Sequence, residues 1–118
     1  MAPEIQSRRP QLDALCRRMG VRRLEVFGSA ARDDFDPASS DIDFLVEFDP
    51  HIDGSALETY FGLKDELEAL FARPVDLVMP GAVRNPYIRA EIDRARQVVY
   101  VRTAVNALLA TLSSLPQA

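Results

Sequence analysis

Two aspartates stand two positions apart at the start of an apolar run, and a third stands inside another such run. Asp41 and Asp43 begin residues 41–48, and Asp76 falls within residues 74–79. Residues two apart on a strand project from one face, so Asp41 and Asp43 can share a cation. An aspartate in a run predicted to be buried needs a hydrogen-bonding partner, a cation or a raised pKa. If the two strands are neighbours, three carboxylates converge, and such hard oxygen ligands suit Mg²⁺ or Mn²⁺ rather than zinc.

A glycine and a serine directly follow the strand predicted for residues 22–27. Gly28 lets backbone N–H groups approach an anion, and the start of a helical turn favours negative charge. The Ser29 hydroxyl can donate to a phosphate oxygen, and Arg32 offers a planar cationic donor one turn later. Neither a P-loop, a dinucleotide-binding glycine turn nor an EF-hand loop fits the spacing. Carboxylates of this kind opposite a phosphate-binding turn therefore indicate nucleotide chemistry.

The charge of the chain is concentrated in one segment. The 118 residues carry a formal net charge of −4, yet residues 33–53 hold eight carboxylates and neither lysine nor arginine. A net acidic chain is not expected to bind nucleic acid or an anionic membrane. With one cysteine and one histidine, a disulfide within the chain and a two-histidine zinc motif are both excluded.

Length and hydropathy favour a soluble protein. A chain of 118 residues has the size of one domain with its own core. No apolar run reaches the roughly 18 residues of a membrane span, and the first residues lack the apolar centre of a signal peptide. We therefore expect a single domain over residues 1–118 in the cytoplasm, with residues 1–9 as an N-terminal tail.

The order of predicted elements gives the fold class. Strands are predicted at residues 22–27, 41–48, 74–79 and 97–101, and a short helical piece at residues 30–32. Apolar spacing predicts a helix around residues 12–19, with Cys16 as a buried inert thiol, and a C-terminal helix within residues 103–118. Two more helices follow a capping box at Ser55 and the pair Asn85–Pro86. The predicted fold is α/β (α+β), a small mixed sheet of about four strands flanked by helices.

Two of these helices are expected to bury an apolar stripe. For the helix after Ser55 the predicted buried residues are Leu57, Tyr60, Phe61, Leu67, Leu70 and Phe71. For the helix after Asn85 they are Tyr87, Ile88, Ile92 and Ala95. The tyrosines are accordingly expected to pack in the core, and Arg84 and Arg89 to be surface charges.

Residues 26–32 (Val-Phe-Gly-Ser-Ala-Ala-Arg) and 40–46 (Ser-Asp-Ile-Asp-Phe-Leu-Val) together resemble the signature of the DNA polymerase beta-like nucleotidyltransferase superfamily. The short chain and the later Val-Asp-Leu-Val of residues 75–78 resemble its minimal nucleotidyltransferase (MNT) branch best. The resemblance covers about residues 10–102. Two departures concern the loop: eleven residues separate Ser29 from Asp41 where ten are usual, and Asp33 replaces a glycine after Arg32.

The resemblance implies a two-metal nucleotidyl transfer. Asp41 and Asp43 would hold two Mg²⁺ ions, Mn²⁺ being an alternative, and Asp76 would help hold one of them. Gly28, Ser29 and Arg32 would bind the triphosphate of ATP, and pyrophosphate would leave. Because the two departures lie in the loop after Ser29, they bear on the phosphate-binding role of Arg32 more than on the metal-binding role of the aspartates.

The resemblance also implies a partner. MNT proteins accompany HEPN proteins, and some are antitoxins that transfer AMP to a tyrosine of the HEPN toxin. We expect that function here, with nucleotidyl transfer to a small molecule such as an aminoglycoside as an alternative. A non-catalytic module that neutralises its partner by binding is the other alternative, and a homodimer stays open.

Overall fold

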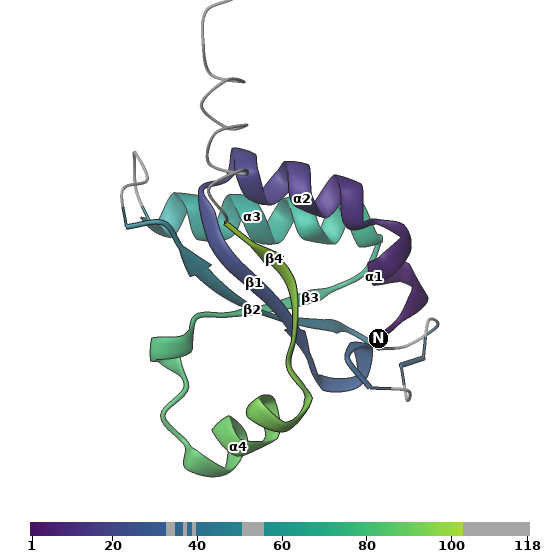
Figure 1. Cartoon of the computed structure of the whole chain (residues 1–118), viewed down its shortest axis with the longest axis vertical. Coiled ribbons are helices and arrows are strands. Elements are labelled where there is room, and N and C mark those ends of the chain that lie inside the picture. Colours follow the sequence, from purple (N-terminus) through teal and green to yellow (C-terminus); the bar gives the residue numbers. More distant parts are fainter. Residues whose placement is uncertain (33–34, 37, 39, 51–55, 103–118) are drawn as a thin grey trace, which may run out of the picture.

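The strands form one mixed sheet that brings the predicted site residues into one region of the molecule. The computed structural model describes residues 1–32, 35–36, 38, 40–50 and 56–102. Within these residues the strands β1 (Val21–Phe27), β2 (Ile42–Phe48), β3 (Val75–Val78) and β4 (Gln97–Val101) pair in the order β3-β2-β1-β4. β1 is antiparallel to β2 and β4, whereas β2 and β3 are parallel. The predicted fold class, a small mixed sheet with flanking helices, is confirmed (Figure 1).

Helices lie on both sides of this sheet. α2 (Arg9–Arg18) and α3 (Ala56–Phe71) lie side by side against one face, and α3 supplies the crossover that the parallel pair requires (Figure 1). α4 (Pro86–Ala95) lies away from these two helices, and the single turns η1 (Gly28–Ala30) and η2 (Pro80–Ala82) follow β1 and β3. Among the described residues, one face of the sheet is therefore covered by two helices, while the other has only α4 at its border.

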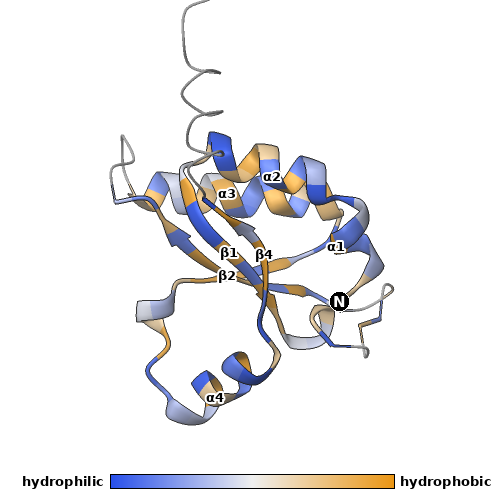
Figure 2. Cartoon of the chain, in the orientation of Figure 1, coloured by the Kyte–Doolittle hydropathy of each residue, from blue (hydrophilic) through white to orange (hydrophobic). Residues whose placement is uncertain are grey.

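The core lies between the sheet and the pair α2 and α3. Its fully buried residues alternate along the strands and recur every three or four residues along the helices, and include Leu12, Cys16, Leu24, Val26, Phe44, Val46, Leu63 and Leu67. The rings of Phe44 and Phe71 lie 5.9 Å apart between centroids. Apolar and polar residues alternate along α2 and α3 (Figure 2). The period-two and helical patterns of the sequence are thus realised by one shared core.

The N-terminal residues are not a tail, which corrects the sequence prediction for residues 1–9. Pro3–Ser7 form α1, and Ile5 is fully buried. The backbone N–H of Ala2 donates to the carbonyl oxygen of Ala30 at 2.7 Å, which joins the start of the chain to η1. A helix of five residues with one buried apolar side chain carries too little periodicity to be predicted from sequence.

The predicted apolar stripe of α3 is partly wrong. The side chains of Leu57 and Phe61 are 65% and 51% exposed, and the buried residues are Leu63, Leu67 and Phe71. The first turns of α3 therefore leave two large apolar side chains in solvent. Periodicity identifies the residues that share a stripe, but the neighbouring elements decide how much of that stripe is covered.

The prediction for α4 is also corrected. Tyr87 and Ile88 are 82% and 53% exposed, and Ile92 is its one buried residue. The helix begins as predicted, because the Asn85 side chain accepts a hydrogen bond from the N–H of Tyr87 at 2.9 Å. Tyr100 is buried, and the Tyr60 hydroxyl donates to the carbonyl oxygen of Leu77 at 2.5 Å. Of the three tyrosines, only Tyr87 departs from the expected packing.

Some predictions fall on residues outside the described ranges. These are the capping serine Ser55, the single histidine His51 and the C-terminal helix of residues 103–118. No helix in the described part of the chain has the length and apolar character to cross a membrane.

Candidate active site

The strand register places two of the three predicted carboxylates opposite each other. In the parallel pair β2–β3, Asp43 is the partner of Asp76, and in the antiparallel pair β1–β2 it is the partner of Phe27. Asp41 stands just before β2, two residues from Asp43 and on the same face. The end of β1, the start of β2 and the middle of β3 therefore meet in one row across the sheet.

The turn after β1 lies directly against this row. Gly28 has φ +66°, and a Cβ at this position would collide with Oδ2 of Asp43 and lie 3.3 Å from its Cγ. The carbonyl oxygen of Gly28 accepts hydrogen bonds from the N–H groups of Ala31 at 3.1 Å and Arg32 at 3.3 Å, which closes the turn of η1. Glycine is required here for two reasons, the left-handed backbone and the close approach of the carboxylate. The predicted phosphate-binding turn and the carboxylate pair thus form one site.

Asp43 titrates abnormally because of these neighbours. Burial, followed by the negative charges of Asp76 and Asp41, raises its pKa to about 6, and the positive charge of Arg32 opposes this shift. All four side chains are therefore in electrostatic range of one another. A bound cation would relieve the repulsion among the carboxylates.

The donor set fits a hard divalent cation in its chemistry, since all three side chains are carboxylates. Asp41 and Asp76 are exposed and Asp43 is half-buried. No group of three or more carboxylate, imidazole or thiolate side chains in the described ranges is arranged closely enough to hold a metal ion. Coordination by all three aspartates would therefore require rotation of their side chains, which exposure permits at Asp41 and Asp76.

The burial predicted for Asp76 from its apolar neighbours is wrong. Val75 and Leu77 are buried on the side of β3 that faces the core, whereas Asp76 points to the opposite side. β3 is an edge strand with parallel pairing on one side only. Asp76 therefore does not carry the cost of a buried charge. It is a candidate site residue because it lies opposite Asp43 in the strand register.

Arg32 follows η1 and lies at the mouth of a hollow of about 430 Å³ that α4 and the start of β4 help to form. Its charge reaches Asp43, because it lowers the pKa of that carboxyl group. Ser29 lies within η1, one residue from the contact between Gly28 and Asp43. The structure therefore brings the six predicted site residues together around the start of β2.

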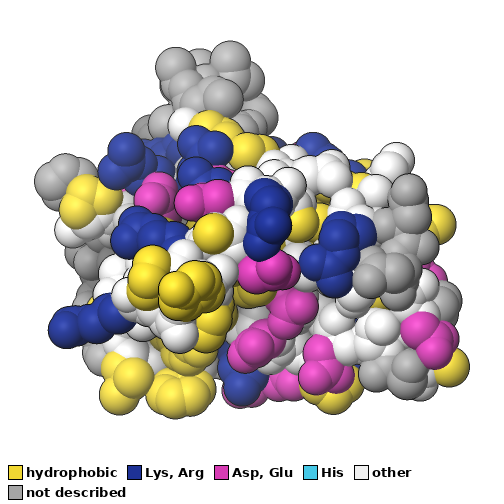
Figure 3. Space-filling model, turned by 90° about the horizontal axis from the view of Figure 1, so that it is seen from below, with side chains coloured by type: hydrophobic (Ala, Val, Ile, Leu, Met, Phe, Trp, Pro, Cys, Tyr) yellow, Lys and Arg dark blue, Asp and Glu magenta, His cyan; other side chains and the backbone are white. Residues whose placement is uncertain are grey.

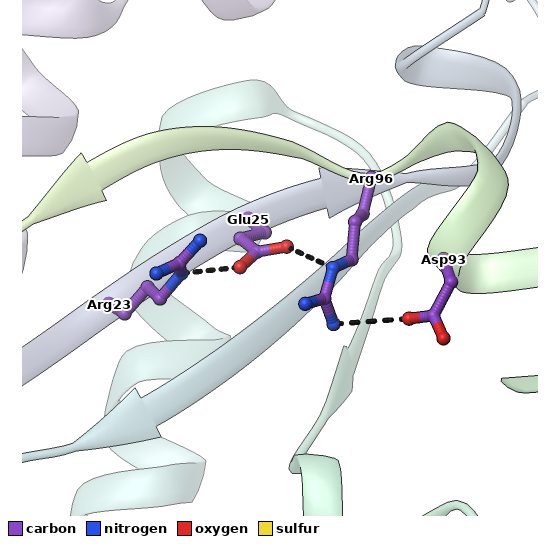
Figure 4. Close-up of polar contacts among 4 residues, drawn as sticks. All are labelled: Arg23, Glu25, Asp93 and Arg96. Atoms are coloured by element: carbon purple, nitrogen blue, oxygen red, sulfur yellow. Dashed lines mark hydrogen bonds and ion pairs between the residues drawn. The ribbon is translucent and has the colours of Figure 1, made fainter.

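A buried ion-pair network beside this row was missed by the sequence reasoning. Glu25, 3% exposed on the central strand β1, pairs with Nε of Arg23 at 2.5 Å and with Nε of Arg96 at 3.1 Å. Nη1 of Arg96 also pairs with Asp93 at 3.2 Å (Figure 4). A buried carboxylate is tolerated when paired cations and hydrogen bonds offset its desolvation. The signal was present in the sequence, as one glutamate within the apolar run Leu24–Phe27.

Comparison with known proteins connects this geometry to a family. Residues 9–99 match the model of the nucleotidyltransferase domain. Over 81 residues, 69% of this chain and 76% of the relative, the sequence is 41% identical to "Putative protein adenylyltransferase MJ0128" of Methanocaldococcus jannaschii. The residues matched by the family model include the glycine turn and all three carboxylates.

Solved structures agree with the sequence matches. One described as a "putative minimal nucleotidyltransferase" superposes with a TM-score of 0.65 at 34% identity, over 82% of this chain and 95% of that one. A chain from the complex of tri-AMPylated Shewanella oneidensis HEPN toxin with MNT antitoxin superposes with a TM-score of 0.56 at 16% identity. That match covers 92% of this chain and 85% of the other, and it shows a shared fold.

Proposed function

The chain belongs to the nucleotidyltransferase domain family, and on that premise we propose that it transfers AMP from ATP to a hydroxyl group of a partner protein. The observation that carries the proposal is the contact of Gly28 with Asp43, opposite Asp76 in the register of β2 and β3. It joins a turn suited to phosphate with carboxylates suited to a divalent cation. Both are needed to bind a nucleoside triphosphate and react at its α-phosphorus.

Different residues of the site bind the triphosphate and the metal ions. Gly28 and Ser29 hold the triphosphate, with Arg32 close enough to add positive charge. Asp41, Asp43 and Asp76 would hold two Mg²⁺ ions, which supply charge neutralisation for the attacking and the leaving oxygen. The acceptor hydroxyl loses its proton to solvent, its oxygen bonds to the α-phosphorus, and the bond from that phosphorus to the leaving pyrophosphate breaks.

A tyrosine of a HEPN-type toxin is the proposed acceptor, with the chain acting as its antitoxin. A relative at 41% identity carries the name of a protein adenylyltransferase, which supports a protein acceptor. The shared fold with an MNT antitoxin solved together with a tri-AMPylated HEPN toxin supports that class of partner.

Intact mass measurement tests the proposal directly. The protein is incubated with Mg²⁺, each nucleoside triphosphate in turn and a HEPN protein encoded beside it. We expect an AMP-sized mass increment on the HEPN protein with ATP, and none with EDTA or with Asp43→Asn. An increment on an aminoglycoside supplied instead would identify the small-molecule alternative. Full protection of cells from the HEPN protein by the Asp43→Asn variant would show that neutralisation needs binding alone.

A further inference from the structure

A hollow of about 230 Å³ lies on the same sheet face as Asp43. Its floor includes Leu45 of β2 and its cross-strand partner Glu25 of β1. Leu45 is two residues after Asp43, and two residues of a strand span about 6.6 Å. The hollow therefore begins one strand period from the carboxylate row, on the side away from Gly28.

The walls of this hollow are held in place by the buried network around Glu25. Arg23 and Arg96 both line it, and both donate to the Glu25 carboxylate at 2.5 and 3.1 Å. Arg96 is held a second time by Asp93 (Figure 4). Because each guanidinium is tied to a buried group, its plane is presented to the hollow in one orientation.

Two further charged groups of the hollow have no ion-pair partner among the described residues. These are Arg89 of α4 and Glu47 of β2, while Pro80 of η2 adds an apolar edge opposite Leu45. Leu45 and Pro80 are the apolar residues of a lining that otherwise consists of charged side chains, three of them arginines. Because arginine stacks on aromatic faces, guanidinium groups beside Leu45 favour an aromatic side chain over an aliphatic one.

The size of the hollow decides between a whole nucleotide and a single side chain. At about 230 Å³ it is smaller than the roughly 300–1,000 Å³ of sites for drug-sized ligands. A ring seated on Leu45 would carry a hydroxyl at its far end to the row of Asp43 and Asp76. Serine and threonine carry their hydroxyl on Cβ and would not span that distance from the same seat.

From this geometry we propose that the hollow is the acceptor pocket and that it takes the phenol side chain of a tyrosine. The inference rests on the proposed transfer to a hydroxyl group and adds the residues that select the acceptor. Arg89 contacts the ring directly. Glu25 is a positioning residue, which acts by holding Arg23 and Arg96.

The surroundings of the hollow fit a protein as the carrier of that tyrosine. Exposed apolar side chains flank its edge in sequence, with Met79 before Pro80 and with Tyr87 and Ile88 before Arg89. Figure 3 shows apolar side chains gathered beside arginine and carboxylate side chains on the side of the molecule that carries α4. Contiguous apolar surface with a charged rim is typical of protein interaction sites.

The first test uses two small probes, N-acetyl-tyrosinamide and N-acetyl-serinamide, with ATP and Mg²⁺. We expect kcat/KM for AMP transfer to the tyrosine probe to exceed that for the serine probe at least about tenfold. Arg89→Ala is expected to raise KM for the tyrosine probe about tenfold and to leave KM for ATP unchanged. Arg84→Ala, which removes an exposed arginine outside the hollow, is the matched control and should change neither constant. Equal kcat/KM values for the two probes, or an Arg89→Ala variant with an unchanged KM for the tyrosine probe, would overturn the proposed acceptor pocket.

The second test does not need turnover. Two-dimensional NMR of the labelled protein, titrated with N-acetyl-tyrosinamide alone, should shift the amide signals of Leu45, Arg89 and Arg96, and Arg89→Ala should reduce these shifts. Absence of shifts at these residues contradicts the pocket even where AMP transfer occurs. Shifts without transfer to any hydroxyl support the pocket and count against the proposed function. Glu25→Gln is expected to raise KM for the tyrosine probe but not for ATP, provided its circular dichroism matches the wild type.

Discussion

The carboxylate of Asp43 lies so close to the backbone of Gly28 that a Cβ on residue 28 would collide with its Oδ2 oxygen. Gly28 directly follows β1, and Asp43 lies in β2, fifteen positions later in the chain. The antiparallel pairing of Phe27 with Asp43 brings them together. A triphosphate held by the turn, as we propose, would therefore be placed at the carboxylates by the pairing of β1 with β2.

Gly28→Ala is predicted to remove activity and to destabilise the fold. The left-handed backbone at φ +66° costs an alanine about 1–2 kcal/mol, and the collision with Asp43 adds to this. We expect at least a hundredfold loss of AMP transfer and a lower midpoint of urea unfolding. Gly81→Ala is the matched control, since a Cβ there meets no atom within 4 Å. A Gly28→Ala variant as active as Gly81→Ala would contradict the role of this contact.

Asp43→Asn is predicted to stabilise the metal-free protein while removing its activity. The folded-state pKa of about 6 exceeds the usual 3.8, so folding disfavours the ionised carboxylate. The penalty is absent well below pH 3.8, where the group is protonated in both states, grows as the pH rises from 3.8 to 6, and is complete above 6. For a half-buried, partly screened group we expect about 1 kcal/mol, a few degrees in Tm.

Thermal unfolding in EDTA at pH 4 and pH 7.5 measures this difference. The Tm of Asp43→Asn should exceed that of the wild type by more at pH 7.5 than at pH 4. Added Mg²⁺ or Mn²⁺ should raise the Tm of the wild type and not that of the variant. A wild type that gains stability from pH 4 to 7.5 relative to the variant would refute the sign of the effect.

Cys16 is predicted to be chemically inert in the folded protein. It is fully buried in α2, and desolvation, with a smaller contribution from the charge of Asp13, raises its pKa to about 12. The thiolate that reacts with disulfide reagents is therefore scarce at neutral pH. Ellman's reagent at pH 8 should find no reactive thiol in the native protein and one per chain in guanidinium chloride. Rapid native labelling would show that α2 opens readily.

Two leucines of α3 are predicted to differ in their effect on stability. Leu67 is fully buried, so Leu67→Ala should lower the free energy of unfolding by about 2–5 kcal/mol. Leu57 is 65% exposed, and Leu57→Ala should change it by less than about 0.5 kcal/mol. Chemical denaturation of both variants measures the contrast. Similar losses would mean that the first turn of α3 is covered after all.

The placement of Asp41, Asp43 and Gly28 could be predicted because it depends on local rules. Alternation on a strand places Asp41 and Asp43 on one face whatever the rest of the fold, and a glycine after a strand allows backbone to approach a charged group. The strand positions followed from apolar runs in the same way. Periodicity could not predict which apolar side chains other elements cover. The burial predicted for Leu57, Phe61, Tyr87 and Ile88 is therefore wrong.

The sequence by itself determined the residue types of the site and the strands that carry them, since both depend on neighbours within a few positions. Only the tertiary structure decided that Asp76 stands exposed opposite Asp43, because strand register depends on residues more than thirty positions apart. It also decided that Ile5 is buried in a short helix and that Glu25 holds Arg23 and Arg96 beside the site. These contacts exist only once distant segments pack together, and no local pattern specifies which segments those are.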